Sequence, residues 1–396
     1  MIKHYLIVLW QNYYKNMQFS SKLPKVGTTI FTTMSALAKE HQAINLSQGF
    51  PDFSCSPELI SLANHYIKNN FNQYAPMPGV IELRERITEI IQTCYNSIYH
   101  PDSEITITAG ATQAIYTTIS AFIKSNDEVI VFEPTYDCYA PAIEINGGIV
   151  VYSQLNNDDF SINWDDVKNK INERTKAIII NSPHNPSGTI ITKNDIQNLE
   201  NLVSGKNIIV ISDEVYEHMV FDGLKHYSVA SSKLLRNQSI IISSFGKTVH
   251  ATGWKIGYVA ATKELMVEFR KVHQFLVFAV NHPLQLALAD FLKNSSNYND
   301  LKQFYQQKRD YFLKLTKNSR LIPLKTSGTY FQLMNFKNIS QEPDTEMAIR
   351  LTKEKKIATI PLSVFYSQKN DRQLLRFCFA KKDETLEKAA EIICQL

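Results

Sequence analysis

The sequence has few cysteines, little net charge and no long apolar run. Its five cysteines form an odd-numbered set without a C-x-x-C pair, so reduced thiols in a cytoplasmic protein are expected, with neither a disulfide framework nor a metal site. The net charge is +4 over 396 residues, and the basic residues are scattered along the chain. This charge pattern gives no indication of binding to nucleic acid or to a membrane surface.

The N-terminal segment is apolar but short. Residues 5–10 are apolar, yet they are too few to span a bilayer. The polar residues 11–16 follow where a signal peptide would carry small residues before its cleavage site. We expect residues 1–20 to be an extension outside the fold. Residues 1–16 are expected to be dispensable, with Met17 as the true first residue.

Short runs of β-branched residues recur in the middle of the chain. They do not alternate with polar residues, which is typical of strands buried on both faces of a parallel sheet. Helix-like segments, such as 111–124 and 195–203, separate several of them. The pattern predicts an α/β fold with a mostly parallel sheet and helices on both faces. The runs lie at residues 105–108, 129–132, 149–152, 177–180, 208–211, 240–242 and 256–260.

The length of the chain indicates two domains. A chain of 396 residues exceeds the size at which one hydrophobic core stops growing. Residues 61–285 carry the strand runs and are expected to form the large domain. Residues 286–396, with separate strands and helices, are expected to form a smaller α+β domain together with 21–60, which look irregular and turn-rich.

Polar residues with distinct chemistry follow the ends of the predicted strands, where open α/β sheets bind ligands. Small residues at the start of a helix favour an anion site, and a buried lysine beside another cation becomes a nucleophile. Each feature alone has a structural explanation, and a lone lysine is usually solvated. Together they match the needs of a phosphorylated pyridine aldehyde: a phosphate cradle, a stacking ring, a carboxylate and a lysine. The residues are 109–112, Tyr136, Asn185, Asp213, Tyr216, Ser244 and Lys247.

The order of these motifs resembles that of the fold-type I, pyridoxal-phosphate-dependent aminotransferases. Within that family the resemblance is greatest to the kynurenine/glutamine aminotransferase-like branch, and in it to the bacterial methionine aminotransferases. The similar blocks extend from about Ser21 to Leu396. They lie at residues 27–31, 45–53, 72–77, 108–112, 182–186, 212–218, 243–247 and 377–382.

The resemblance implies roles for the residues at the strand ends. Lys247 would form an imine with pyridoxal 5'-phosphate and move the substrate proton, while Asp213 would pair with the pyridine nitrogen. Tyr216 and Asn185 would hydrogen-bond the ring oxygen. Tyr74 would reach the phosphate from the other subunit, which implies a homodimer with shared sites. The remaining cofactor-binding residues would be Gly110, Ala111, Thr112, Tyr136, Ser244 and Lys255.

The resemblance also implies a substrate pocket. Arg376 would clamp the substrate α-carboxylate, with help from Asn185 and the backbone of Gly49. Phe31 and Phe278 would line the side-chain pocket. An apolar pocket favours methionine, aromatic or glutamine-like side chains over aspartate. The implied activity is ping-pong transfer of the amino group of methionine, and of aromatic amino acids, to a 2-oxo acid.

Three alternatives stay open beside this function. The chain could be a kynurenine or glutamine transaminase, because a pocket methylene changes selectivity by only ~1–3 kcal/mol. A β-lyase that acts on cysteine S-conjugates would use the same cofactor. A catalytically inactive binding protein is disfavoured, because Lys247 is present and the segment before Ser21 is too short for an added DNA-binding domain.

Overall fold

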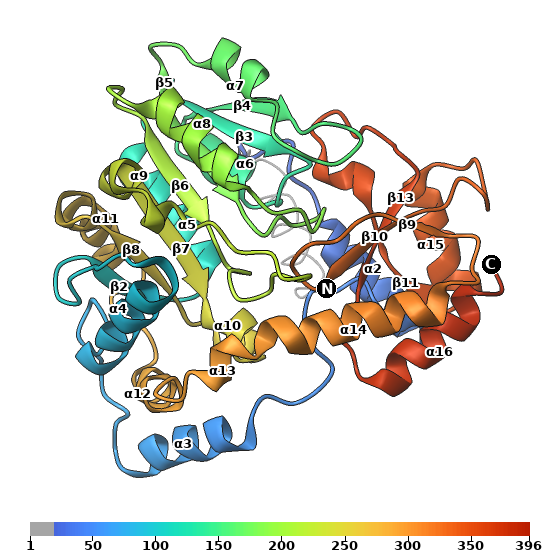
Figure 1. Cartoon of the computed structure of the whole chain (residues 1–396), viewed down its shortest axis with the longest axis horizontal. Helices are drawn as coiled ribbons and strands as arrows, with labels where there is room; N and C mark the ends of the chain where they lie inside the picture. The colour runs from blue at the N-terminus through green and yellow to red at the C-terminus, as the bar shows by residue number, and fades with distance from the viewer. Residues whose placement is uncertain (1–19) are drawn as a thin grey trace, which may run out of the picture.

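The computed structural model describes residues 20–396 and is built around one seven-stranded sheet (Figure 1). The predicted extension and the proposed start at Met17 lie outside the described residues, apart from residue 20. The strand order is β2-β8-β7-β6-β5-β3-β4. In this sheet of the described chain, the two antiparallel pairings are those of β8 with β2 and β7, and the other pairings are parallel, so the predicted mostly parallel sheet is confirmed. The strands are β2 (Ile105–Thr108), β3 (Glu128–Glu133), β4 (Ile149–Gln154), β5 (Thr175–Asn181), β6 (Ile209–Asp213), β7 (Ser239–Ser244) and β8 (Gly257–Ala261).

Alternate residues of the central strands enter two different cores. In β5, Ile178 and Ile180 belong to one buried cluster, while Ala177 and Ile179 belong to the cluster on the opposite face. Both faces are therefore apolar, which explains the unbroken β-branched runs in the sequence. Figure 1 shows the helices that cover the sheet. One face is covered by α5 (Ala111–Phe122), α6 (Tyr139–Ile145) and α11 (Lys263–Leu276), and the other by α4 (Ile81–Tyr95), α8 (Lys193–Val203), α9 (Lys233–Gln238) and α12 (His282–Phe291).

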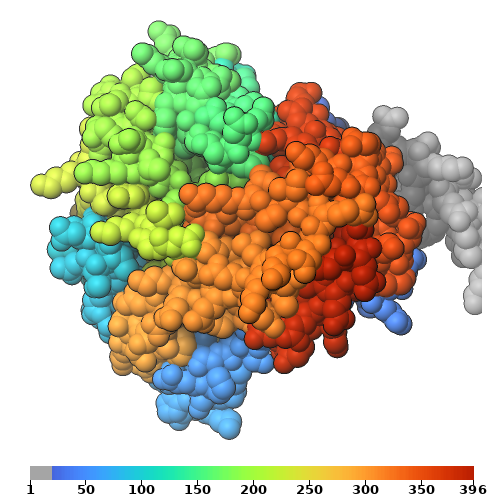
Figure 2. All heavy atoms as spheres, turned by 45° about the vertical axis from the view of Figure 1, so that its right-hand side comes forward, coloured from blue at the N-terminus to red at the C-terminus, as the bar shows by residue number. Residues whose placement is uncertain are grey.

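The C-terminal part of the chain forms a second, antiparallel sheet in the order β12-β13-β10-β9. A two-stranded parallel sheet joins β1 to β11 and so links the beginning of the described chain to its C-terminal part. Figure 2 shows the orange and red C-terminal segments gathered in one region of the surface. The strands are β1 (Ile44–Asn45), β9 (Ile322–Pro323), β10 (Phe331–Asn335), β11 (Ile357–Ala358), β12 (Ile360–Pro361) and β13 (Leu374–Cys378). The predicted domain boundaries stay a prediction.

The remaining helices surround these sheets. Helix α14 packs against α16, and α3 packs against α12. In residues 20–396, no helix is long and apolar enough to cross a membrane. These helices are α2 (Ile30–Glu40), α3 (Pro57–Lys68), α7 (Trp164–Lys170), α10 (Phe245–Thr248), α13 (Ser296–Asn299), α14 (Leu301–Thr316), α15 (Asp344–Glu354) and α16 (Asp383–Ile393).

Residues 21–60 are less irregular than the sequence indicated. Helix α2 begins at Ile30, after the Thr29 side chain accepts a hydrogen bond from the Thr32 amide. The helix buries Met34 and Ala38, one turn apart, beside α15 and β11. The expectation of irregular structure is therefore wrong for this segment, because an amphipathic helix completes the packing around β11.

Candidate active site

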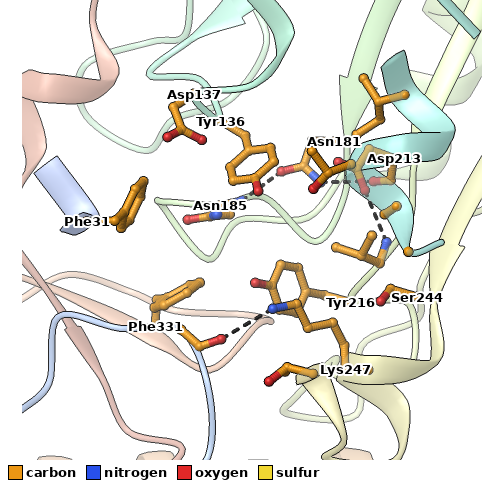
Figure 3. A pocket seen from close by; sticks show the side chains of 18 of the residues that line it. Phe31, Tyr136, Asp137, Asn181, Asn185, Asp213, Tyr216, Ser244, Lys247 and Phe331 are labelled. Atoms are coloured by element: carbon orange, nitrogen blue, oxygen red, sulfur yellow. Dashed lines mark hydrogen bonds between the residues drawn. The ribbon is translucent and has the colours of Figure 1, made fainter. Parts of the chain in front are cut away.

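A cavity of about 340 Å³ opens where the central strands end. Asn181, Asp213 and Ser244 are the last residues of β5, β6 and β7, and all three line the cavity. The parallel strands bring these ends to one edge of the sheet. In Figure 3, Tyr136 and Asp137 lie on one side of the cavity and Tyr216 and Lys247 on the other. The predicted site residues that line it are Phe31, Gly49, Gly110, Ala111, Thr112, Tyr136, Asn185, Asp213, Tyr216, Ser244, Lys247, Lys255 and Arg376.

One end of the cavity is suited to an anion. Helix α5 starts at Ala111 behind Gly110, and within the described chain no side chain caps its first amide groups. Lys255 points toward this end, since a methyl group placed on Gly110 would lie 3.4 Å from its Nζ. Lys255 itself adopts a left-handed backbone conformation, with φ of 53°, which is strained for a residue other than glycine. Free amides, a helix dipole and an ammonium group therefore converge on one point.

Asp213 lies in the same cavity and is buried. Its carboxylate accepts a hydrogen bond of 2.6 Å from the Tyr139 hydroxyl, and its Oδ1 accepts a weaker one of 3.3 Å from the Val215 amide. Burial raises the pKa of Asp213 to about 6, although the Tyr139 hydrogen bond opposes this change. The charged form is thus costly without a cationic partner, and a protonated ring nitrogen would provide one.

The loop after β5 is held by hydrogen bonds to both neighbouring elements. The Asn181 side chain accepts a hydrogen bond of 2.9 Å from the Asn185 amide and donates one of 2.9 Å to the carbonyl of Asp213. Asn185 in turn accepts a hydrogen bond of 2.6 Å from Nη1 of Arg376. This chain of contacts links Asn185 to the backbone at the end of β6 on one side and to the guanidinium of β13 on the other.

Lys247 lies in α10, the short helical turn that follows β7. Its Nζ donates hydrogen bonds to the Tyr330 hydroxyl at 2.8 Å and to the Gly49 carbonyl at 3.3 Å. Burial lowers the pKa of Lys247 to about 8; the neighbouring cations Lys255 and Arg376 also lower it, while Cys378 opposes the shift. A substantial fraction of this amine is therefore neutral near physiological pH, which a nucleophilic lysine requires.

Arg376 is a fully buried guanidinium in β13. It lies 3.8 Å from the centroid of the Phe331 ring, and Nη2 donates a hydrogen bond of 3.1 Å to the Ser47 carbonyl. Its Nε is buried without a hydrogen-bond partner among residues 20–396. Burial lowers the pKa of Arg376 to about 10. An unsatisfied buried cation of this kind is stabilised by an anionic ligand such as a carboxylate.

Comparisons with known proteins add a family to this geometry. Residues 41–393 match the family model described as aminotransferase class I and II. The chain belongs to this family. Fold-type I aminotransferases use pyridoxal phosphate.

Several relatives of this aminotransferase resemble it over nearly its whole length. It is 48% identical to the methionine aminotransferase of Escherichia coli, over 95% of this chain and 98% of the relative. A crystal structure of an E. coli protein identified a methionine aminotransferase function for that protein. This chain matches it with a TM-score of 0.94, over 96% of this chain and 100% of that one. The kynurenine–oxoglutarate transaminase of Dictyostelium discoideum is 32% identical, over 95% of this chain and 96% of the relative.

The residues at the site of this aminotransferase that the sequence analysis missed include Tyr330 and Asp137. Tyr330 hydrogen-bonds Lys247, and Asp137 lines the cavity next to Tyr136. Asp137 could have been identified from the sequence, because it directly follows Tyr136 on a loop at a strand end. No comparable signal marked Tyr330, because it reaches the lysine only through the packing of the segment before β10 against the central sheet.

Two predicted residues lie outside this cavity. The rings of Tyr74 and Phe278 contact each other, with centroids 5.3 Å apart, and they are 81% and 47% exposed. Phe278 follows α11 in a left-handed conformation, with φ of 66°, and remains at the surface beside Tyr74. Phe278 does not line the cavity of its own chain, and its place in the side-chain pocket stays a prediction. For Tyr74, exposure is compatible with the predicted contact to a second subunit.

Proposed function

We propose that the chain is a pyridoxal 5'-phosphate-dependent aminotransferase that moves the amino group of methionine, and of aromatic amino acids, to a 2-oxo acid by a ping-pong mechanism. The similarity to the E. coli methionine aminotransferase, 48% over almost the full length, carries the choice of substrate. The 32% identity to kynurenine–oxoglutarate transaminase makes kynurenine a second donor to be tested.

The donor groups of the cavity fit this cofactor. The start of α5, Lys255 and Ser244 suit a phosphate group. The buried carboxylate of Asp213, which lines the same cavity, suits a protonated pyridine nitrogen. Tyr136 also lines the cavity and can stack on a ring. When bound, pyridoxal phosphate takes up the amino group of the donor and passes it to the oxo acid.

Lys247 would attach the cofactor through its neutral amine, which is available because the pKa is about 8. After the substrate amine has displaced it, Lys247 would take the proton from the substrate Cα. Asp213 would keep the ring nitrogen protonated, and Tyr216 would hydrogen-bond the ring oxygen together with Asn185. These roles are consistent with the position of all four side chains in one cavity.

The substrate would bind between the cofactor and β13. Arg376 and Asn185 would hold the α-carboxylate, since they are already hydrogen-bonded to each other at 2.6 Å. Phe31 and Phe331 form the apolar end of the cavity, and a thioether packs well against aromatic rings. This environment favours methionine and aromatic side chains over charged ones.

The function is tested by a Lys247→Ala variant and a panel of donors. We expect the variant to lose both the absorbance of covalently attached cofactor and at least about 10³-fold in turnover, because no other group supplies the amine. A matched control is Lys263→Ala, an exposed lysine at the start of α11, which should leave both unchanged. Normal turnover by the Lys247→Ala protein would contradict the assignment.

The donor panel separates the remaining alternatives. Methionine, phenylalanine, kynurenine and glutamine should each be assayed with several 2-oxo acids. Methionine is expected to have the highest kcat/KM. Pyruvate and ammonia released from a cysteine S-conjugate without any oxo acid would instead favour the β-lyase.

We further propose that the protein is a cytoplasmic homodimer with shared sites. Three exposed aromatic side chains, Tyr74, Phe275 and Phe278, support the dimer, because such side chains are enriched in protein interfaces. Phe275 is 86% exposed in the single chain. The five free thiols support a reducing compartment.

A further inference from the structure

Tyr330 is the hydrogen-bond partner of Lys247, yet the proposed mechanism gives it no role. Its hydroxyl lies 2.8 Å from Nζ and also donates a hydrogen bond to the Gly49 carbonyl. The same carbonyl accepts a hydrogen bond from Nζ at 3.3 Å. The amine of Lys247 thus lies in a small polar site formed by one hydroxyl and one carbonyl.

The Tyr330 hydroxyl is held firmly in place. Its side chain is fully buried, and its ring contacts those of Phe331, Tyr216 and Tyr305 at centroid distances of 4.9, 5.2 and 5.7 Å. A ring packed on several sides cannot turn away without opening a cavity. The position of the hydroxyl is therefore a fixed property of the site.

The direction of the hydrogen bonds follows from the groups available. A phenol has one proton to donate, and Tyr330 donates it to Gly49. The lone pairs of its oxygen then face Nζ, so Lys247 must be the donor in the second hydrogen bond. An acceptor stabilises an ammonium group more than a neutral amine, because hydrogen bonds to the charged form are stronger.

We propose that Tyr330, with the Gly49 carbonyl, is the resting site of the Lys247 amine whenever that amine is not attached to the cofactor. This inference rests on the proposed function, in which the amine is free for part of every reaction cycle. The amine would then alternate between two defined positions. At rest it would stay close to the Gly49 backbone, which we expect beside the substrate carboxylate, and so within reach of the reacting atoms.

The resting site also opposes the influences that favour the neutral amine. Burial, Lys255 and Arg376 favour the neutral form, while Cys378 and Asp213 favour the ammonium. Tyr216 also faces Nζ, with its ring centroid 5.7 Å away. The Tyr330 hydroxyl differs from these groups because it makes a direct hydrogen bond to Nζ. It can also be removed by mutation without changing a charge. Loss of its hydroxyl should therefore lower the pKa of Lys247 below about 8.

The test compares Tyr330→Phe with Tyr305→Phe. The Tyr305 ring contacts that of Tyr330, but its buried hydroxyl has no hydrogen-bond partner in residues 20–396. The control thus removes the same atom next to the site without touching the amine. Cofactor-free protein is labelled with acetic anhydride across pH 6–10, and acetylation of Lys247 is followed by mass spectrometry. We expect the apparent pKa of Lys247 to fall by about one unit in Tyr330→Phe and to stay unchanged in Tyr305→Phe.

An unchanged Lys247 pKa in a folded Tyr330→Phe protein would overturn the proposal. If that variant does not fold, a crystal structure of the cofactor-free wild-type protein decides. Nζ of Lys247 within 3.5 Å of the Tyr330 hydroxyl supports the resting site, and a longer distance contradicts it. Either negative result leaves the aminotransferase assignment intact, because that assignment depends on the Lys247→Ala variant.

Discussion

Asp137 is a carboxylate in the cavity that has no part in the proposed contacts to the cofactor. Figure 3 shows it near Phe31, at the end of the cavity away from Asp213. Burial raises the pKa of Asp137, while the nearby Arg376 lowers it. Once Arg376 binds the α-carboxylate of a substrate, no second cation remains near Asp137 among the described residues that line this end of the cavity. A carboxylate on the substrate side chain would therefore have no cationic partner there.

This charge arrangement predicts the effect of Asp137→Asn. The substitution keeps the shape and removes the negative charge, so a distal carboxylate would no longer be repelled. We expect kcat/KM for glutamate to rise about tenfold relative to kcat/KM for methionine. Steady-state assays with both donors measure this ratio. Asp165→Asn, on the exposed side of α7, is the control, and an equal ratio in both variants would contradict the predicted role.

At the scale of elements, Gly257 is where three of them meet. A methyl group on this residue, the first of β8, would lie 2.5 Å from the Ser243 carbonyl of β7 and 3.2 Å from the Ala111 amide of α5. Only a residue without Cβ lets β8 approach both the end of β7 and the free amides of α5. The shape of the anion end of the cavity therefore depends on this glycine.

The corresponding prediction is that Gly257→Ala weakens both the fold and cofactor binding. Displacing backbone in a packed region costs typically about 1–3 kcal/mol, which should lower the thermal midpoint, and the shifted α5 amides should raise the Kd for pyridoxal phosphate about tenfold. Thermal unfolding and fluorescence titration measure the two effects. Gly253→Ala is the matched control, because nothing in the described chain lies within 4 Å of its added methyl group. Equal behaviour of the two variants would show that β8 can move without consequence.

The elements that the sequence predicted well are those with burial on both faces. Runs such as 177–180 needed no knowledge of the fold, because a strand between two cores is β-branched throughout. Helix α11 was overlooked although Met266, Phe269 and His273 are buried on one of its faces. Charged residues at positions 263, 264, 268, 270 and 271 interrupt the apolar residues of that helix and obscure its buried face. Two-residue strands such as β9 and β12 leave no pattern to read.

The site was predictable to the extent that it follows from topology. Asp213 and Lys247 end or follow parallel strands, so their meeting at one edge could be expected from the sequence. Tyr330 could not, because it approaches Lys247 from the segment leading into β10, in a different sheet. Contacts across sheets depend on how the two packed layers sit on each other, which a linear pattern does not encode.

At the scale of the whole molecule, Tyr74 is the predicted cofactor-binding residue that does not line the cavity of its own chain. Tyr74, predicted to contact the phosphate, lies 81% exposed beside Phe278 and away from the lining residues. In a symmetric dimer the same surface of each chain contacts the other, so both copies of Tyr74 could complete the opposite cavity. The proposed homodimer thus makes a quantitative prediction about mixtures of inactive chains.

Mixing a Lys247→Ala chain with a Tyr74→Ala chain should restore activity. In each hybrid dimer, one site would combine an intact Lys247 with an intact Tyr74 from the other chain, while the second site would lack both. Random exchange in an equal mixture yields about a quarter of the wild-type number of sites. Lys247→Ala mixed with Asp213→Ala is the control: both residues line the cavity of one chain, so no hybrid site is complete. Turnover after unfolding and joint refolding measures the outcome, and equally low activity in both mixtures would rule out shared sites.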